Sequence, residues 1–358
     1  MTPDDVDAVV LVGGQGTRLR PLTLSAAKQM LPTAGVPFLT HLLSRIRAAG
    51  LRHVVLGTSY RAETFSDYFG DGSAFGLEIE YVVEASPLGT GGGIRNVADR
   101  LRGSTAMVFN GDILSGVDLH ALLSTHRRTE ADVTLHLVRV SDPRRFGSVP
   151  TDADGRVLDF LEKTENPPTD QINAGCYVFE RATLEAIPAG RVVSVERETF
   201  PGLLAAGARV QGHVDSSYWL DVGTPPSFVR GSADLVQGVA PTDALPGPPG
   251  PALLLPGSRV HPDAVIEGGS TVGAGAVVHE RARIDTSVIF DGARIGAGAE
   301  IVRSVIGAGA QIGDGTIICD GVIADRASIG ARCELSGGIR VWPEVRIPDG
   351  GVRFSPDV

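Results

Sequence analysis

The chain has 358 residues, room for two or three domains at about 150 residues each, so a miniprotein is excluded. Its 32 Lys and Arg against 42 Asp and Glu give a formal net charge of −10, which argues against a general polyanion-binding surface. Any phosphate site must therefore be local. The low share of aromatic residues, 5%, and the high number of glycines, 46, are unusual for a globular protein. The second half of the chain explains this composition.

Neither a membrane segment nor a secretion signal is indicated. No apolar run approaches the ~20 residues of a membrane helix, and residues 1–7 are acidic where a signal peptide would be basic. We therefore expect a cytoplasmic protein without membrane association. Cys176, Cys319 and Cys333 show no CxxC spacing, so we expect small buried hydrophobic residues rather than disulfides or a zinc site.

The first half alternates β-branched runs with amphipathic stretches, a pattern typical of a mostly parallel sheet with interleaved helices. Leu39, Leu42, Leu43 and Ile46 fall at helical spacing, and Thr224 is a candidate N-cap. This α/β domain should end near residue 238. The predicted strands are 8–12, 53–58, 77–83, 106–110, 133–140 and 172–179, and the predicted helical stretches are 38–49, 93–101 and 226–236.

The second half carries a repeat. Residues 239–257 contain six prolines and predict a domain linker. Four 17-residue segments follow, from Thr271, Val288, Val305 and Val322, each with aliphatic residues at its second, eighth and fourteenth positions. Three inward residues per coil and glycine-rich corners predict a three-sided parallel β-helix over 258–358, which the regular corners favour over a glycine-rich sandwich.

A glycine-rich segment, VVLVGGQGTRLRPLT, runs from a predicted strand into a loop. Glycines let the backbone approach an anion, and an arginine adds a permanent charge with a bidentate fork. The segment lacks the Lys-Ser/Thr of a P-loop and the third glycine of a dinucleotide fingerprint. It favours a nucleoside triphosphate site over a plain strand-to-loop turn. The candidate residues are Gly13, Gly14, Gly16, Thr17 and Arg18.

Extended to GGQGTRLRPLT and followed by Lys28 in SAAKQMLP, the segment resembles the signature of the sugar-nucleotide pyrophosphorylase family, and the likeness spans the whole chain. The chain most resembles the guanylyltransferase branch that acts on mannose 1-phosphate. The resemblance implies a Rossmann-like nucleotidyltransferase domain (1–238), a linker (239–257) and a left-handed, hexapeptide-repeat β-helix (258–358). It also implies transfer of a guanylyl group from GTP to mannose 1-phosphate, giving GDP-mannose and pyrophosphate by Mg²⁺-assisted in-line attack without a covalent intermediate.

Two acidic residues are candidate metal ligands. Asp112 follows a predicted strand at its carboxyl end, where open α/β sheets bind ligands, but on its own it could equally cap the next turn. The resemblance implies Asp112 as one Mg²⁺ ligand and Asp221, in YWLDVGTP, as a second. Two carboxylates plus triphosphate oxygens suit Mg²⁺. Asp221 could instead cap the turn at Gly223.

The resemblance also implies contacts to the phosphates and the sugar. Arg18 would stabilise charge at the α-phosphate, Lys28 would steer the triphosphate or sugar phosphate, and Lys163 would grip the sugar phosphate. A lone lysine is usually a solvated surface charge, so these roles depend on the motif context. The residues implied at the sugar are Gly147, Glu162, Lys163 and Asn173.

Base selection is expected in EASPLGTGGG, with Glu84, Gly89 and Thr90 as candidate nucleotide-binding residues. A carboxylate can accept hydrogen bonds from N1–H and the 2-amino group of guanine, whereas adenine offers a lone pair at N1. Glu84 therefore favours guanine, unless it merely ends a strand. The Lys28-Gln29 pair resembles thymidylyltransferases acting on glucose 1-phosphate, so these and other nucleotide-sugar pyrophosphorylases stay as alternatives.

Two further functions are compatible with parts of the sequence. The β-helix could carry acyltransferase activity, with His261 and His279 as the histidines available, but His279 follows the inward Val278 and should point outward. A non-catalytic regulatory subunit would tend to lose the charged residues that this chain retains. We expect the β-helix to mediate homo-oligomerisation or to contact the catalytic domain, and we expect no nucleic-acid partner.

Overall fold

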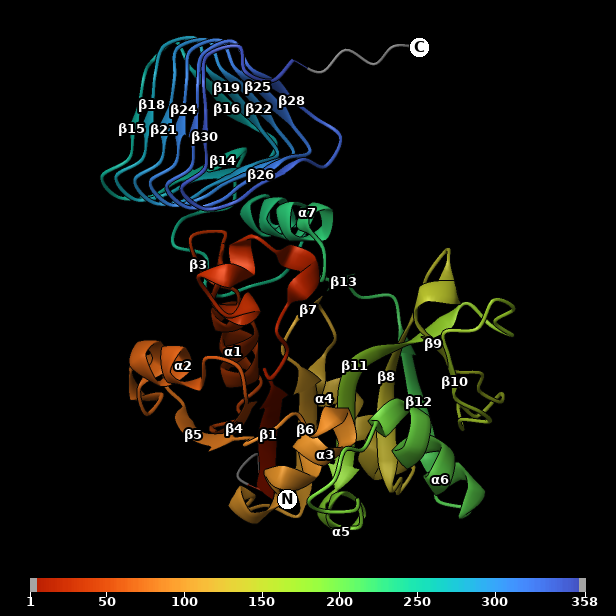
Figure 1. Ribbon diagram of the computed structural model, residues 1–358. Coiled ribbons are helices and arrows are strands. Elements are labelled where there is room, and N and C mark those ends of the chain that lie inside the picture. Colours follow the sequence, from red (N-terminus) through yellow and green to blue (C-terminus); the bar gives the residue numbers. More distant parts are fainter. Residues whose placement is uncertain (1–4, 354–358) are drawn as a thin grey trace. The chain divides into compact units, whose positions relative to one another are not determined.

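The computed structural model describes residues 5–353, and contacts divide them into two units (Figure 1). The sheet unit contains the residues up to Gly14 together with Leu42–Trp219. The β-helix unit contains Gln15–His41 together with the chain from Leu220 onward. The segment after the first strand therefore belongs to the same unit as the C-terminal repeats, which the order of the sequence does not suggest.

A nine-stranded sheet forms the core of the sheet unit, in the order β10-β9-β11-β6-β1-β4-β5, with β8 beside β11 and β12 beside β8. Strands β6, β1, β4 and β5 are mutually parallel, and β11 runs antiparallel to β6 and β8. The six predicted strands are confirmed with small shifts at their ends. The strands are β1 (Val6–Leu11), β4 (His53–Thr58), β5 (Glu78–Val83), β6 (Thr105–Asn110), β8 (Val133–Arg139), β9 (Gly147–Ser148), β10 (Leu161–Glu162), β11 (Gln171–Glu180) and β12 (Val210–Asp215).

The helices of this unit connect the strands. The predicted helix 38–49 is confirmed as α1, whose apolar face includes the buried Leu39, Leu43 and Ile46. The α-helices are α1 (Phe38–Ala48), α2 (Ala62–Phe69), α3 (Gly89–Asn96), α4 (Leu119–Arg128), α5 (Arg181–Glu185) and α6 (Phe200–Ala205). In the described residues no helix is long and apolar enough to cross a membrane.

Helix α3 differs from its prediction. It begins at Gly89, four residues before the predicted stretch, and ends at Asn96, with a separate 3₁₀ turn at Ala98–Arg100. Glycines are poor helix formers, so propensity alone places no helix over GTGGG. Tertiary contacts stabilise the helix over these glycines, because the N–H groups of Gly91 and Gly92 donate to the carbonyl of Val193 at 2.9 and 3.2 Å.

Three parallel sheets form the β-helix, as the repeat predicts, and the arrangement is consistent with the left-handed form. The first sheet contains β14 (Ala252–Leu254), β17 (Ser270–Val272), β20 (Val288–Ile289), β23 (Val305–Ile306), β26 (Val322–Ile323) and β29 (Arg340–Val341). The second contains β15 (Arg259–Val260), β18 (Val277–Val278), β21 (Arg294–Ile295), β24 (Gln311–Ile312), β27 (Ser328–Ile329) and β30 (Arg346–Ile347). The third contains β16 (Val265–Glu267), β19 (Arg283–Asp285), β22 (Glu300–Val302), β25 (Ile317–Cys319) and β28 (Glu334–Leu335).

All twelve predicted inward residues are buried in one hydrophobic cluster, so the positions inferred from the repeat are confirmed. They are Val272, Val278, Ile284, Ile289, Ile295, Ile301, Ile306, Ile312, Ile318, Ile323, Ile329 and Leu335. His261 and His279 are exposed, as expected for His279. Cys176 and Cys333 are buried as predicted, and Cys319 is half-buried.

The β-helix starts earlier than its repeat suggests. Strand β14 lies inside 239–257, the stretch whose composition predicts a linker, and Leu253 pairs with Thr271. The step between these two residues is 18 positions, and the step from Val322 to Arg340 in the last coil is also 18. A 17-residue repeat therefore identifies only the inner coils.

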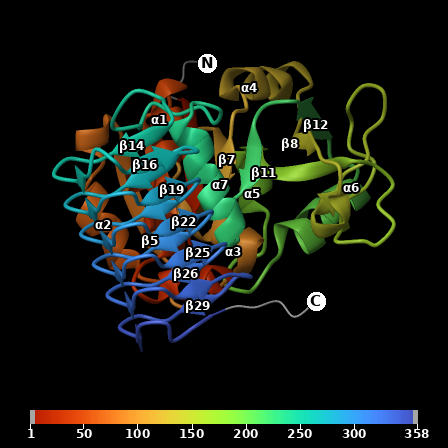
Figure 2. The ribbon, with the colours of Figure 1, turned by 90° about the horizontal axis from the view of Figure 1, so that it is seen from above.

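Helix α7 (Pro225–Val236) lies along the β-helix (Figure 2) and also contacts the segment 15–41. The predicted N-cap is confirmed, because Thr224 and Ser227 form a capping box. Phe228 packs edge-to-face on Phe290 of the β-helix, with ring centroids 6.4 Å apart. On the other side, the N–H of Ala34 donates to the Ser232 hydroxyl at 3.0 Å.

The segment 15–41 is irregular, with 3₁₀ turns and a small hairpin. Its elements are 3₁₀ turns at Thr17–Leu19, Leu22–Leu24 and Lys28–Met30, and strands β2 (Pro32–Thr33) and β3 (Val36–Pro37). His41 is buried at its end and contacts the Thr33 carbonyl at 2.9 Å and the Thr242 hydroxyl at 2.8 Å. Burial lowers the pKa of His41 to about 4, so this histidine is neutral at physiological pH.

The inward and outward positions of one strand should differ sharply in their contribution to stability. In β25, Ile318 is fully buried and the neighbouring Ile317 is 37% exposed. Ile318→Ala should lower the free energy of unfolding by about 2–5 kcal/mol, because it leaves a cavity between stacked coils. Ile317→Ala, the matched control, should cost less than about 1 kcal/mol. Urea unfolding of the full chain measures both, and equal losses would contradict the inward assignment.

Candidate functional site

The carboxyl ends of four parallel strands meet at one edge of the sheet. Gly13 and Gly14 follow β1, Glu84 follows β5, and Asp112 follows β6 after one residue. Ligands of open α/β sheets bind at this edge. The topology therefore brings the first predicted glycines, the predicted base-selecting carboxylate and one predicted metal ligand to the same edge.

Hydrogen bonds tie these strand ends together. The N–H of Val12 donates to the Gly57 carbonyl at 2.9 Å, and the Ser59 hydroxyl donates to the Gly13 carbonyl at 2.5 Å. A Cβ atom at Gly13 would lie 2.9 Å from the Ser59 hydroxyl oxygen and 3.9 Å from Oε2 of Glu84. Gly13 and Glu84 are thus close neighbours.

Glu84 is half-buried and turned back toward the start of α3. Its Oε2 accepts from the N–H of Leu88 at 3.1 Å, and its Oε1 lies 2.8 Å from where a Cβ atom of Gly93 would be. Burial raises the pKa of Glu84, and the hydrogen bond from Leu88 opposes that shift. Glu84 therefore follows β5 half-buried, with one carboxylate oxygen held by the Leu88 N–H.

Gly89 and Thr90 contact protein in this structure. The Thr90 hydroxyl donates to Oε2 of Glu196 at 2.7 Å and accepts from the N–H of Val195 at 2.9 Å. Gly89 has φ of +72°, and a Cβ atom there would lie 2.6 Å from the Val193 carbonyl oxygen. These contacts fix the segment beside Glu84.

Residues 193–196 were missed as partners of this segment. They lead into a π-helix, Val195–Thr199, which continues into α6. The only sequence feature that marks them is the charged segment SVERETFP, with an arginine between two glutamates. Nothing local shows which glycines such a run will contact.

Three of the predicted sugar residues lie together on a two-stranded extension of the sheet. Gly147 in β9 pairs with Glu162 in β10, and a Cβ atom at Gly147 would lie 3.0 Å from Oε2 of Glu162. The Lys163 ammonium lies 3.4 Å from Oε1 of Glu162, and its side chain is 61% exposed. The carboxylate is mostly buried, so this pair presents its cation outward.

Asn173 lies on β11 at a break in its pairing with β8. Its side-chain amide donates to the Tyr177 hydroxyl at 2.8 Å and accepts from the N–H of Gly175 at 3.0 Å. These bonds hold the chain across the irregularity. Ile172, the preceding residue, pairs with Ser148 next to Gly147, so Asn173 and Gly147 are on neighbouring strands.

Asn110, at the end of β6, was not predicted as a site residue. A Cβ atom at Gly175 would lie 2.8 Å from its side-chain nitrogen, so the positive φ and the missing side chain of Gly175 make room for Asn110. The sequence feature that could have indicated Asn110 is VFNGD, where this asparagine ends an apolar run two residues before Asp112.

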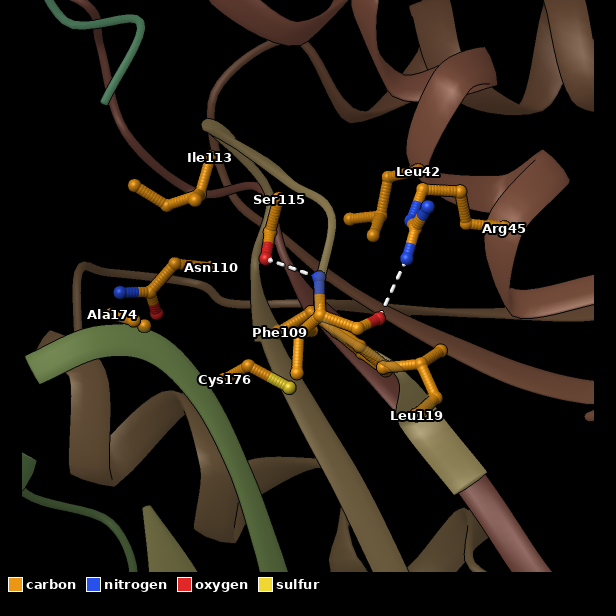
Figure 3. Close-up of a pocket in the computed structure, with 11 residues that line it drawn as sticks. Leu42, Arg45, Phe109, Asn110, Ile113, Ser115, Leu119, Ala174 and Cys176 are labelled. Carbon is orange, nitrogen blue, oxygen red and sulfur yellow. Dashed lines mark hydrogen bonds between the residues drawn. The ribbon is translucent and has the colours of Figure 1, made fainter. Parts of the chain in front are cut away.

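A largely apolar cavity lies beside Asn110, between α1, β7 (Ile113–Ser115) and β11 (Figure 3). Arg45 borders it and donates to the Val117 carbonyl at 2.6 Å. The N–H of Val117 in turn donates to the Ser115 hydroxyl at 3.3 Å. These two bonds brace the chain that follows the turn carrying Asp112.

The rest of the signature belongs to the β-helix unit. Gly16 has φ of +60°, and a Cβ atom there would lie 3.0 Å from both Cβ of Lys28 and Cγ2 of Thr23. The Thr23 hydroxyl donates to the Gly16 carbonyl at 2.9 Å. Lys28 is only 8% exposed, so it is no solvated surface lysine. Gly16 is needed here because the turn is left-handed and packed against Lys28.

Arg18 and Asp221 face one another. Nη2 of Arg18 lies 3.9 Å from Oδ2 of Asp221, and the Arg18 side chain is 65% exposed. A Cβ atom at Gly223 would lie 2.5 Å from Nη2 of Arg18. The structure thus places Asp221, a predicted metal ligand, next to Arg18, the predicted phosphate-binding arginine. Because Gly223 has no side chain, the Arg18 guanidinium fits beside it.

The mostly parallel sheet, the glycine-rich loop after β1 and the C-terminal repeats together define a class of protein: a nucleotide-binding α/β protein with a β-helix. Residues 7–238 match the family model described as Nucleotidyl transferase, and residues 249–350 match the GMPPB C-terminal domain. The chain belongs to the nucleotidyl transferase family, and it is an enzyme of the nucleotidyltransferase class.

Known relatives agree with this assignment. The chain is 67% identical to a mannose-1-phosphate guanylyltransferase of Mycobacterium tuberculosis, over 100% of both chains. It is 35% identical to the mannose-1-phosphate guanylyltransferase catalytic subunit beta of Drosophila pseudoobscura, over 63% of this chain and 61% of the relative. The crystal structure of HddC from Yersinia pseudotuberculosis, complexed with GMP-PN, is similar with a TM-score of 0.57 and 28% identity, over 64% of this chain and 99% of HddC.

The close approach at Gly89 should be essential for activity. Gly89→Ala adds an atom 2.6 Å from a backbone carbonyl at a left-handed position, whereas Gly190, with φ of +70°, has open space. Gly89→Ala should lower kcat/KM by about tenfold or more, since α3 and Glu84 must shift. Gly190→Ala, the matched control, should cost only about 1 kcal/mol of stability. Equal rates in the two variants would contradict the role of the contact.

Proposed function

We propose that the protein transfers a guanylyl group from GTP to mannose 1-phosphate, giving GDP-mannose and pyrophosphate. The observation that carries the proposal is the 67% identity to a mannose-1-phosphate guanylyltransferase over the full length of both chains. The contacts of Glu84, Arg18, Lys28 and Glu162 support it. Each is consistent with a role that the reaction needs.

Glu84 is the proposed base-selecting residue. Its carboxylate is held in place by Leu88 and lies beside Gly13 at the carboxyl edge of the sheet. Guanine would donate two hydrogen bonds to it, whereas adenine would oppose it with a lone pair and leave a half-buried charge unpaired. Gly89 and Thr90 would act by holding this segment against Val193 and Glu196.

The phosphates would be bound by backbone N–H groups of the glycine loop and by two cations. Gly13, Gly14, Gly16 and Thr17 supply the N–H groups in this proposal. Arg18 would neutralise charge at the α-phosphate, where a fork of donors matches two oxygens at once. Lys28, fixed against Gly16, would act as a point charge on the triphosphate or the sugar phosphate.

Mannose 1-phosphate would lie beside β9 and β10. Lys163 would bind its phosphate through the exposed ammonium, and Glu162 and Asn173 would bind sugar hydroxyls next to the Gly147 backbone. With both substrates positioned, the sugar phosphate oxygen attacks the α-phosphorus in line and pyrophosphate leaves. The residues hold the reacting groups and neutralise charge, so no covalent enzyme intermediate is needed.

Nucleotidyltransferases of this family generally use a divalent metal, and we propose Mg²⁺. Among the described residues there is no group of three or more His, Cys, Asp or Glu side chains that could hold a metal ion alone. Carboxylates at Asp112 and Asp221 fit Mg²⁺, which prefers oxygen ligands and usually binds through one or two carboxylates plus substrate phosphates. Bound there, the ion would neutralise phosphate charge.

The remaining assignments stay predictions. We propose a catalytic domain over 1–238, a linker over 239–257 and a β-helix domain over 258–358, although β14 already pairs within the linker. Homo-oligomerisation through the β-helix and a cytoplasmic location are proposed on the resemblance to the family.

A substrate panel tests the proposal. The protein is incubated with each of GTP, ATP, UTP and dTTP and with mannose or glucose 1-phosphate, and pyrophosphate release is measured. GTP with mannose 1-phosphate should give the highest kcat/KM. A preference for dTTP or UTP with glucose 1-phosphate would select the alternative pyrophosphorylases, and binding without turnover would select a regulatory subunit.

Asp112→Asn tests the metal assignment in the same assay. The variant should lose activity by about 100-fold or more, because the amide is neutral and a poorer ligand for a hard cation. Asp99→Asn is the matched control, since the Asp99 side chain is 92% exposed. Full activity of the Asp112 variant at saturating Mg²⁺ would contradict the assignment.

Glu84→Gln should separate base choice from stability. Burial raises the pKa of folded Glu84, so the ionised side chain costs stability above that pKa and nothing below the unfolded value. Glu84→Gln should therefore be as stable as the wild type near pH 4 and more stable at pH 7–8, while its preference for GTP over ATP falls by about tenfold or more. Glu63→Gln, on the exposed side of α2, is the control. An unchanged base preference would contradict the role of Glu84.

A further inference from the structure

The first sheet of the β-helix has an outer face that is buried. Its outward side chains form a row of Thr271, Val288, Val305 and Val322, which are 3%, 2%, 0% and 2% exposed. Outward positions of the other two sheets are mostly polar and exposed, such as Arg294, Gln311, Glu300 and Glu334. One face of the β-helix is thus built as a contact surface, and α7 packs on its first coils.

Arg340 continues this row in the last coil. It pairs with Val322 across β26 and β29, so an arginine takes the place that valine holds in three preceding coils. Its Nη1 donates to the backbone carbonyl of Arg20 at 2.7 Å. Arg20 is two residues after Arg18, in the glycine-rich signature, and both residues belong to the β-helix unit.

The signature turn is the 3₁₀ turn Thr17–Leu19, in which Leu19 is buried and Arg18 faces Asp221. The N–H groups of Leu19 and Arg20 donate to the carbonyls of Gly16 and Thr17 at 2.9 and 3.2 Å, within the same turn. The turn follows a stretch with three glycines, which lose more conformational entropy on ordering than other residues. A charge-assisted hydrogen bond from a rigid β-helix is suited to hold such a turn.

We propose that Arg340 is a positioning residue for the nucleotide-binding signature, so that the last coil of the β-helix fixes the loop carrying Arg18. The proposal rests on the proposed function, in which Arg18 binds the α-phosphate. Arg340 acts through the Arg20 carbonyl and does not itself touch substrate. The β-helix then contributes to the reaction within one chain, beyond any role in assembly.

Hydrogen exchange and kinetics on the full chain test this. Arg340→Met keeps the apolar stem and removes the donors, Arg340→Lys keeps one charged donor group, and Arg346→Met on the exposed side of β30 is the matched control. Amide exchange over 16–24 without nucleotide should be about three- to tenfold faster in Arg340→Met, the range expected for one hydrogen bond. Its kcat/KM for the nucleotide should fall by a similar factor, Arg340→Lys should lie between, and Arg346→Met should match the wild type.

Two results would overturn the proposal. One is unchanged exchange over 16–24 in Arg340→Met, and the other is faster exchange with unchanged kcat/KM. Circular dichroism and thermal unfolding check that the variants are folded, and if Arg340→Met is not, Arg340→Lys must still show a smaller effect of the same sign. Failure of the proposed function would appear differently, as a wild type inactive with GTP and mannose 1-phosphate, while the exchange difference persists.

Discussion

The candidate site depends on the parallel pairing of β1 with β4 and β6. Parallel strands in register end together, so the loops after them reach the same edge whatever their sequences. This constraint delivers Gly13 and Asp112 to one edge, and β5 adds Glu84. Hydrogen bonds from Val12 to Gly57 and from Ser59 to Gly13 then fix the loops relative to one another.

Glycine serves two purposes around this edge, and the sequence alone does not separate them. Gly16 permits a left-handed turn packed against a buried lysine, while Gly89 and its neighbours let α3 approach the chain at Val193. Both groups look like anion-binding loops in sequence. In α3 the N–H groups of Gly91 and Gly92 already donate to the Val193 carbonyl, so these two glycines serve helix packing.

Much of the fold was predictable because its signals are local. Strands such as β4 contain a short apolar run, and the stacked residues from Val272 to Leu335 follow a fixed period. These local patterns identified them without knowledge of contacts. The bonds of Thr90 with Glu196, the place of 15–41 in the β-helix unit and the first coil at β14 were not predictable. Each depends on partners far along the chain or on an 18-residue step that interrupts the period.

The β-helix shows how a regular repeat can still carry specific contacts. Its inward positions are interchangeable aliphatic residues, because each coil needs only volume and shape to stack on the next. Its outward positions need no such uniformity, and there the three sheets differ: the row from Thr271 to Val322 is buried, whereas outward positions of the other two sheets are mostly polar and exposed. The repeat therefore fixes the scaffold, while individual residues outside the inward positions make its specific contacts: Phe290 packs on Phe228 of α7, and Arg340 donates to the Arg20 carbonyl.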